Sequence, residues 1–201
     1  HILGAVGRKP FLEGLGLDSI GVELDSEGKV QVSKGFETNI PGIYALGDLV
    51  TGPMLAHKAE EEAVSFAETL CGETRSVDYQ HIPSVVYTHP ELAMVGATEE
   101  SLKEASTAYR KGVFHFRANG RARASGAVDG WVKMLADGGA DQILGVHILG
   151  ENAGELIHEI VVAMKFKATS QDLARICHAH PTFSETVKES ALAVSDRTIH
   201  S

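Results

Sequence analysis

The first 80 residues of this 201-residue chain contain one strong strand pattern and one strong helix pattern. Residues 42–46 form an apolar run that predicts a buried strand, and residues 55–70 predict an amphipathic helix. One strand and one helix cannot bury both of their faces against each other. We therefore expect an incomplete α/β segment here, whose remaining elements come from a longer chain or from a second chain.

The expected helix at residues 55–70 has an apolar face and a charged face. The apolar positions recur at helical spacing, and they are Ala56, Ala59, Ala63, Phe66, Ala67 and Leu70. The charged residues lie largely off this face, and they are Lys58, Glu60, Glu61, Glu62 and Glu68. This pattern predicts a helix that packs by its apolar side. Before it, residues 21–24 and 29–32 predict a short strand pair joined by a turn at residues 25–28.

Residues 81–201 are richer in strand patterns than the first 80 residues. Strands are expected at residues 84–88, 111–117, 130–136 and 142–149, with a turn at residues 137–141 between the last two. Helices are expected at residues 99–105, 153–167, 170–177 and 184–193. Asn152 is expected to cap the second of these helices, with Glu155 three residues on. This part predicts a complete α+β domain containing an antiparallel meander.

Composition excludes several classes of protein. The formal net charge of −9 would repel the phosphate backbone of a nucleic acid. No apolar run approaches the roughly 18 to 20 residues that span a bilayer, so we expect no membrane association. Cys71 and Cys177 are far apart and belong to no CxxC-type pair, which indicates structural thiols in a reducing compartment. They are poor candidates for metal ligands, and we expect no metal site.

The strongest local signal lies between residues 177 and 185. Pro181 favours an extended backbone at His180, and a helix begins soon after, so the imidazole should be held at a rigid corner. Glu185 falls in the first turn of that helix, where it could orient the ring and stabilise the imidazolium of a general base. The alternative is structural, because Thr182 and Glu185 also have the spacing of a capping box.

A second signal is the Gly47-Asp48 pair at the carboxyl end of the expected strand, where open α/β sheets bind their ligands. Asp48 could accept hydrogen bonds from the hydroxyls of a sugar or polyol. The helix that follows begins near Met54, Leu55, Ala56 and His57, and its free N–H groups would favour an anionic or electron-rich ligand. The alternative is that Gly47 and Asp48 merely begin a loop and that His57 is a surface residue.

Other features give weaker hypotheses. His178 and His180 could bind zinc, but no third or fourth ligand has a useful spacing. The basic residues Arg117, Arg121 and Arg123 are expected in a solvated loop or a subunit contact. Ser184 lies beside His180 but in no Gly-x-Ser-x-Gly elbow, which argues against a serine hydrolase.

Five segments occur in the order found in one enzyme family, and these are Gly7-Arg8-Lys9-Pro10, residues 43–48, residues 52–59, Tyr87-Thr88-His89-Pro90-Glu91 and residues 178–185. On these segments the chain resembles the FAD-dependent pyridine nucleotide-disulfide oxidoreductases over essentially its whole length. Residues 52–59 and the sequence around Phe183 resemble the members that oxidise dihydrolipoamide more than those that reduce glutathione. The resemblance implies electron transfer from the dithiol through a redox disulfide and FAD to NAD+.

The resemblance also implies roles for individual residues. His180 would be the acid–base group and Glu185 its orienting partner, within a homodimer in which the histidine reaches the partner's active site. The implied cofactor-binding residues are Gly7, Asp48, Met54, Leu55, Ala56 and His57. Residues 1–9 would end the NAD-binding domain, residues 10–80 would form a central segment that contacts FAD, and residues 81–201 would form the interface domain.

The sequence departs from the family pattern in one large respect. It lacks the paired redox cysteines and both Gly-x-Gly-x-x-Gly turns, and Cys71 and Cys177 do not replace the redox pair. We therefore expect the C-terminal portion of a longer enzyme, which alone neither retains FAD tightly nor turns over. The alternatives are an inactive dimerisation or assembly module and a related disulfide reductase of the glutathione-reductase type.

The resemblance further implies partners and a location. The expected partners are a second copy of the chain, lipoyl domains and the core of a 2-oxo acid dehydrogenase complex. The expected location is the mitochondrial matrix in a eukaryote or the cytoplasm in a bacterium.

Overall fold

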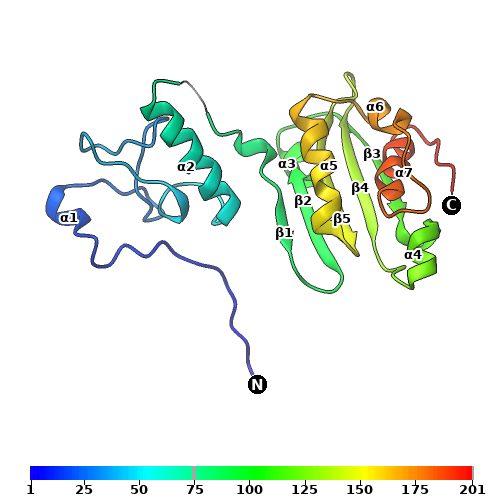
Figure 1. Cartoon of the computed structure of the whole chain (residues 1–201), viewed down its shortest axis with the longest axis horizontal. Helices are drawn as coiled ribbons and strands as arrows, with labels where there is room; N and C mark the ends of the chain where they lie inside the picture. Colours follow the sequence, from blue (N-terminus) through cyan, green and yellow to red (C-terminus); the bar gives the residue numbers. More distant parts are fainter. Residues whose placement is uncertain (74–75, 201) are drawn as a thin grey trace. The chain divides into compact units, whose positions relative to one another are not determined.

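The computed structural model describes residues 1–73 and 76–200, and the chain divides into two compact units (Figure 1). We call these the N-terminal unit, His1–Tyr79, and the C-terminal unit, Gln80–Ser201. A short 3₁₀ helix, η2 (Tyr79–His81), lies where the chain passes from one unit to the next. Among the described residues, no helix is both long enough and apolar enough to cross a membrane.

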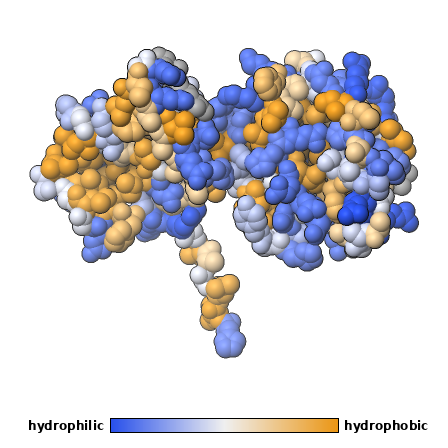
Figure 2. All heavy atoms as spheres, in the orientation of Figure 1, coloured by the Kyte–Doolittle hydropathy of each residue, from blue (hydrophilic) through white to orange (hydrophobic). Residues whose placement is uncertain are grey.

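The N-terminal unit contains little regular structure. Its elements are the short helix α1 (Leu17–Ile20), the 3₁₀ helix η1 (Gly47–Leu49) and the long helix α2 (Ala56–Leu70). A small core of Val22, Val30 and Val50 holds the loops together, with partly buried apolar residues around it. Residues 1–9 are exposed and form neither helix nor strand. Figure 2 shows hydrophobic residues at the surface of this unit, where Phe11, Leu15 and Ile20 are among those exposed.

The buried strand predicted at residues 42–46 is not formed. Tyr44 makes an isolated antiparallel bridge to Glu37, and the tyrosine is 39% exposed. The strand pair predicted at residues 21–32 is likewise reduced to a bridge between Leu24 and Val30, although its turn forms at residues 25–28. Apolar segments become strands only when a neighbouring strand supplies a ladder of hydrogen bonds, and this unit supplies single bridges.

Within this unit helix α2 buries a polar face and leaves most of its predicted apolar face exposed. The side chains of Lys58 and Glu62 are fully buried and Ser65 is 1% exposed, whereas Ala56, Ala63, Ala67 and Leu70 are exposed. Burial of the two charges is tolerated because each has hydrogen-bond partners in the unit. The hydrophobic spacing alone could not reveal these partners.

The C-terminal unit is built on a five-stranded antiparallel sheet with the strand order β1-β2-β5-β4-β3. Its strands are β1 (Ser84–Val86), β2 (Glu91–Gly96), β3 (Tyr109–His115), β4 (Trp131–Asp137) and β5 (Ile143–Gly150). Strands β3, β4 and β5 form the predicted meander. Strand β2 was not predicted, and it pairs with β5 over residues 91–96, a partner some 50 residues away in the sequence.

Helices cover one face of this sheet. Helix α5 (Ala153–Lys165) packs on β2 and β5, and helix α7 (Glu185–Ala193) packs on β3 and β4 (Figure 1). Alternate strand residues meet both helices in one core, to which Val132, Met134, Val146, Ile148, Ile157, Ile160, Val187 and Ala191 belong. The remaining helices are α3 (Glu99–Glu104), η3 (Phe116–Ala118), α4 (Gly120–Ser125) and α6 (Ser170–Arg175). The α+β prediction for residues 81–201 is therefore confirmed.

Two local predictions for the C-terminal unit hold only in part. Arg121 and Arg123 lie in helix α4, which Asn119 caps, so they are not in a loop, and the alternative of a subunit contact stays a prediction. Asn152 is the N-cap residue of α5, as predicted, but it adopts a left-handed backbone conformation with φ 59°, and its side chain makes no capping hydrogen bond. Asparagine is a suitable residue for this left-handed backbone conformation, because it tolerates positive φ better than most other residues do.

Candidate functional site

His180 lies in the loop between α6 and α7, and Glu185 is the first residue of α7. The Nδ1 atom of His180 lies 2.9 Å from Oε1 of Glu185. The histidine side chain is 68% exposed, whereas that of Glu185 is 18% exposed. A carboxylate acceptor places the proton of the neutral ring on Nδ1, which leaves Nε2 as the nitrogen that can bind a further proton. The structure thus brings together the two residues predicted to form an acid–base pair.

Glu185 also holds the loop that carries His180. Its second oxygen, Oε2, accepts the backbone N–H of Thr182 at 2.8 Å. The Thr182 hydroxyl donates to the carbonyl of Ala179 at 2.7 Å, and Ser184, not Thr182, is the N-cap residue of α7. The capping box is therefore only half formed, through the bond from the Thr182 N–H to the same carboxylate that contacts the imidazole.

The pKa of Glu185 lies below its usual value. Burial works in the opposite direction, but the hydrogen bonds from Thr182 and His180 and the electrostatic interactions with His180 and His200 outweigh it. The carboxylate therefore stays ionised near neutral pH. An ionised carboxylate stabilises the imidazolium that forms when His180 takes up a proton.

His178 has a different environment from that of His180. Its side chain is 5% exposed, its Nε2 lies 2.7 Å from Oε1 of Glu159, and its Nδ1 lies 3.1 Å from the carbonyl oxygen of Ile176. The hydrogen bond to Glu159 raises the pKa of His178 above its usual value, against the effect of burial. Both ring nitrogens are thus engaged within the protein. In the part of the chain that the structure describes, no group of three or more histidine, cysteine or acidic side chains is placed to hold a metal ion.

The second predicted site lies in the N-terminal unit, around Gly47 and Asp48. Gly47 is buried, and Asp48 is exposed within η1. The backbone N–H of Gly47 donates to Oε2 of Glu62 at 2.7 Å, and its carbonyl accepts a hydrogen bond from Nζ of Lys58 at 2.8 Å. The two side chains form an ion pair of 2.9 Å, and both are fully buried. Helix α2 therefore holds both backbone polar groups of Gly47.

Glu62 has a third partner, which the sequence analysis did not identify. The hydroxyl of Tyr79 donates to Oε1 of Glu62 at 2.7 Å. Burial, followed by the neighbouring carboxylate, raises the pKa of Tyr79. The only sequence signal for this cluster is the four-residue spacing between Lys58 and Glu62, which is also the spacing of an ordinary ion pair on a helix surface.

The N-terminus of α2 carries the remaining predicted cofactor residues. Leu55 is its N-cap, and the leucine side chain itself makes no capping hydrogen bond to the first backbone N–H groups of the helix. The guanidinium of Arg8 donates to the carbonyl oxygen of Met54, which brings the Arg8 side chain to this turn. Gly7 adopts φ 116°, a conformation that favours glycine.

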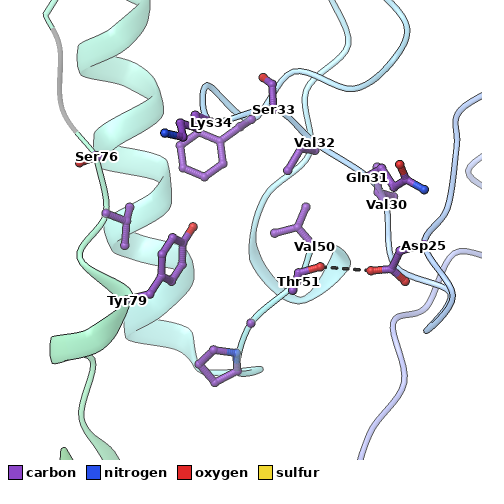
Figure 3. A pocket seen from close by; sticks show the side chains of 14 residues that line it. Asp25, Val30, Gln31, Val32, Ser33, Lys34, Val50, Thr51, Ser76 and Tyr79 are labelled. Carbon is purple, nitrogen blue, oxygen red and sulfur yellow. Dashed lines mark hydrogen bonds between the residues drawn. The ribbon is translucent and has the colours of Figure 1, made fainter. Parts of the chain in front are cut away.

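A pocket of about 770 Å³ lies in the same unit (Figure 3). Its lining includes Val30, Val50 and Tyr79, and the carboxylate of Asp25 at its edge accepts a hydrogen bond from the Thr51 hydroxyl at 3.1 Å. Asp48 and residues 54–57 are not among the residues that line it. The pocket and the predicted cofactor residues are therefore different surfaces of this unit.

Cys71 and Cys177 are both free and exposed, and they lie in different units. The predicted site residues are also divided, because His180 and Glu185 lie in the C-terminal unit and the predicted cofactor residues lie in the N-terminal unit.

The fold of the C-terminal unit is that of a known class of domain. Residues 82–191 match the family described as pyridine nucleotide-disulphide oxidoreductase, dimerisation domain. Residues 1–63 match the family described as pyridine nucleotide-disulphide oxidoreductase. The chain belongs to the pyridine nucleotide-disulphide oxidoreductase family.

Individual relatives agree with this assignment. The chain is 54% identical over 199 residues to mitochondrial dihydrolipoyl dehydrogenase 1 of Arabidopsis thaliana, a match that covers 99% of the chain and 39% of the relative. It is 49% identical over 194 residues to mitochondrial dihydrolipoyl dehydrogenase of Bos taurus, covering 96% of the chain and 38% of the relative. The chain thus spans about two fifths of the length of these relatives.

The fold is also similar to that of a solved structure, LpdA from Mycobacterium tuberculosis. The TM-score is 0.81 at 28% sequence identity, and the match covers 91% of this chain and 40% of that one. The predicted fold class and the predicted family are therefore both confirmed.

Proposed function

We propose that this chain forms part of a dihydrolipoyl dehydrogenase and supplies its acid–base histidine. The observation that carries the proposal is the hydrogen bond between His180 and the shielded carboxylate of Glu185. The names of the relatives from Arabidopsis thaliana and Bos taurus support a dihydrolipoyl group as the proposed substrate.

The proposed chemistry depends on the ionisation of a thiol. A dithiol attacks a disulfide as its thiolate, so a base must first remove a proton from sulfur. Nε2 of His180 would take that proton, and Glu185 would stabilise the resulting imidazolium through Nδ1. The dithiol is oxidised to a disulfide by the loss of two electrons and two protons. We propose that the electrons pass through a redox disulfide and FAD to NAD+.

The residues of the N-terminal unit fit a flavin nucleotide. Asp48 is exposed and could accept hydrogen bonds from ribityl or ribose hydroxyls. The N-terminus of α2, at residues 54–57, presents backbone N–H groups and the positive end of a helix dipole, which suit an electron-rich ring edge. FAD, where bound, supplies the two-electron acceptor. The buried pair of Lys58 and Glu62 keeps the Gly47 backbone, and with it Asp48, in one position.

We also propose a division of the chain by role. Residues 1–9 would end the NAD-binding domain, residues 10–80 would contact FAD, and residues 81–201 would form the interface of a homodimer. The description of the family matched by residues 82–191 as a dimerisation domain supports the last assignment. In this arrangement His180 would act in the active site of the partner subunit.

The names of the relatives support further proposals about subcellular location and partner proteins. Because both are mitochondrial, we propose the mitochondrial matrix as the location. A dihydrolipoyl dehydrogenase would act on the lipoyl domains of 2-oxo acid dehydrogenase complexes, and we propose these as partners.

A second candidate function is that of an assembly module without activity of its own. The observation in its favour is that the C-terminal unit contains a continuous core across sheet and helices. In this case residues 81–201 would form dimers, and His180 would contribute only to loop structure.

The two functions can be separated in a chimera. This chain replaces the segment that it matches in the Arabidopsis thaliana relative, and the product is assayed for oxidation of dihydrolipoamide by NAD+ and for oxidation of NADH by an artificial acceptor. We expect His180→Gln to lower the first activity by about 100-fold or more and to spare the second, because the loss of a general base costs 10² to 10⁴ in rate.

The matched control is His115→Gln, which removes another exposed histidine of the same unit. It should leave both activities within about twofold of the unsubstituted chimera, because substitutions away from the reacting groups usually have small effects. An equal loss of both activities in the His180 variant would show that the residue is structural and would favour the assembly module.

A further inference from the structure

Asn119 links the N-terminus of α4 to the loop that carries His180. Its Oδ1 accepts the backbone N–H of Ala122 at 2.9 Å, which caps the helix. Its Nδ2 donates to the carbonyl oxygen of Thr182 at 3.0 Å, across 63 positions in the sequence. Asn119 is 4% exposed. One buried amide therefore satisfies a helix terminus and a loop carbonyl at the same time.

Two neighbouring contacts reinforce this link. The ring of Phe116, which is fully buried, lies 5.8 Å from the ring of Phe183 between centroids. At Gly120, an added Cβ would lie 3.6 Å from Cε1 of His180, so the imidazole packs against the first residue of α4. Residues 116–120, which we call the docking segment, thus contact three residues of the loop at 180–183.

We propose that Asn119 is a positioning residue for the acid–base histidine, an inference that rests on the proposed function. A continuous series of hydrogen bonds supports it. Asn119 fixes the carbonyl of Thr182, the N–H of Thr182 binds Oε2 of Glu185, and Oε1 of Glu185 binds Nδ1 of His180.

The amide acts through the orientation of Thr182. The buried Nδ2 donor fixes the direction of the Thr182 carbonyl, and the planar peptide geometry on either side limits how the residue can turn. Rotation of Thr182 would move its N–H away from Glu185, and the carboxylate would then lose one of the two bonds that hold it beside His180. A displacement of about 1 Å of an acid–base group can cost on the order of 100-fold in rate.

The sharpest test uses Asn119→Asp. Aspartate keeps the oxygen that caps α4, and it is an equally good N-cap residue. It lacks the N–H donor and presents a second acceptor to the Thr182 carbonyl. The variant therefore removes the link to the loop while the helix cap stays. Thr98→Ala is the matched control, because it removes the side-chain cap of α3, which lies outside the docking segment.

The variants are made in the chimera described above. We expect Asn119→Asp to lower dihydrolipoamide oxidation about tenfold relative to NADH oxidation by an artificial acceptor, and to move the pH profile of the first activity. We expect Thr98→Ala to leave the ratio of the two activities unchanged. The proposal is overturned if Asn119→Asp leaves that ratio unchanged or lowers both activities equally.

His180→Gln in the same chimera separates this inference from the proposed function. If His180→Gln lowers the ratio and Asn119→Asp does not, the positioning role is wrong while the proposed function stands. If His180→Gln itself leaves the ratio unchanged, the proposed function is wrong.

A second measurement on the 201-residue chain itself applies if the chimera binds no flavin. The ¹⁵N chemical shifts of the His180 ring report which nitrogen carries the proton in the neutral form. We expect Nδ1–H to predominate in the unsubstituted chain and in Thr98→Ala, and to lose population in Asn119→Asp. Equal populations in all three chains would overturn the proposal.

Discussion

His178 and His180 stand two residues apart and have opposite environments. The side chain of His178 is 5% exposed, and both of its nitrogens bind groups of the C-terminal unit. The side chain of His180 is 68% exposed, and its Nδ1 binds Glu185. An extended backbone turns successive side chains to opposite sides, but residues two apart point the same way. The loop geometry at 179–181, rather than simple alternation, therefore separates an anchored imidazole from an accessible one.

Glu185→Gln tests the orienting role of the carboxylate. Glutamine can still accept a hydrogen bond from Thr182, but it carries no charge to stabilise the imidazolium of His180. We expect the chimera carrying this variant to lose about 10- to 100-fold in dihydrolipoamide oxidation, as is typical when acid–base catalysis is impaired. NADH oxidation by an artificial acceptor should be retained. A dihydrolipoamide rate equal to that of the unsubstituted chimera would contradict the orienting role.

The pH dependence of stability should reveal the pairing of His178 with Glu159. The pKa of His178 is raised in the folded chain, chiefly by its hydrogen bond to Glu159, so the folded state binds this proton more tightly than the unfolded state does. The stabilisation is complete below the unfolded pKa of about 6.5 and is lost as the pH rises through the folded value. Urea unfolding at several pH values should show this decline.

His178→Gln serves as the comparison for that measurement, because glutamine does not titrate. The difference in unfolding free energy between the two chains should shrink as the pH rises from about 6 to about 9. A difference that stays constant, or that grows with pH, would show that His178 does not gain a proton on folding.

The His–Glu pair could be predicted from the sequence because its two residues and the proline between them lie within six positions. The proline after His180 and the spacing to Glu185 fix the loop and the first helical turn within six residues. The pairing of β4 with β5 was predictable for the same reason, since the short turn at residues 138–142 joins these two strands. Local sequence signals were therefore enough to predict the two residues of the pair, although the loop that carries them is also held by the distant Asn119.

What the sequence could not reveal depends on distant partners. Residues 42–46 are apolar enough for a strand, but a strand forms only beside another. Asn119 meets Thr182 across 63 positions, and periodicity gives no sign of that contact. Helix α2 has an alanine-rich face, yet Lys58 and Glu62 are the buried residues because Gly47 and Tyr79 satisfy them.

Lys58→Met tests the buried pair on helix α2. The substitution would leave Glu62 buried with an uncompensated charge, which typically costs about 3–5 kcal/mol. We expect the chimera with this variant to lose bound flavin, as judged by its absorbance after gel filtration, because the Gly47 backbone is no longer held. The double variant Lys58→Met/Glu62→Leu should be more stable than the single variant, since it leaves no buried charge. If the single variant retains as much flavin as the parent chimera, the buried pair of Lys58 and Glu62 does not support the flavin site.

Gly112→Ala tests whether α7, which begins with Glu185, must sit tightly on β3. A Cβ at Gly112 would approach the carbonyl oxygen of Ser190 to 2.2 Å and the backbone nitrogen of Val194 to 2.5 Å, so helix or strand must move. Overpacking of this kind costs about 1–3 kcal/mol, which urea unfolding would measure. Gly139→Ala is the control, because its Cβ would meet a side-chain oxygen at 3.6 Å. Displacement of α7 also displaces Glu185, so Gly112→Ala should reduce dihydrolipoamide oxidation in the chimera more than Gly139→Ala does. If the two variants have equal free energies of unfolding, the close packing of α7 on β3 is refuted.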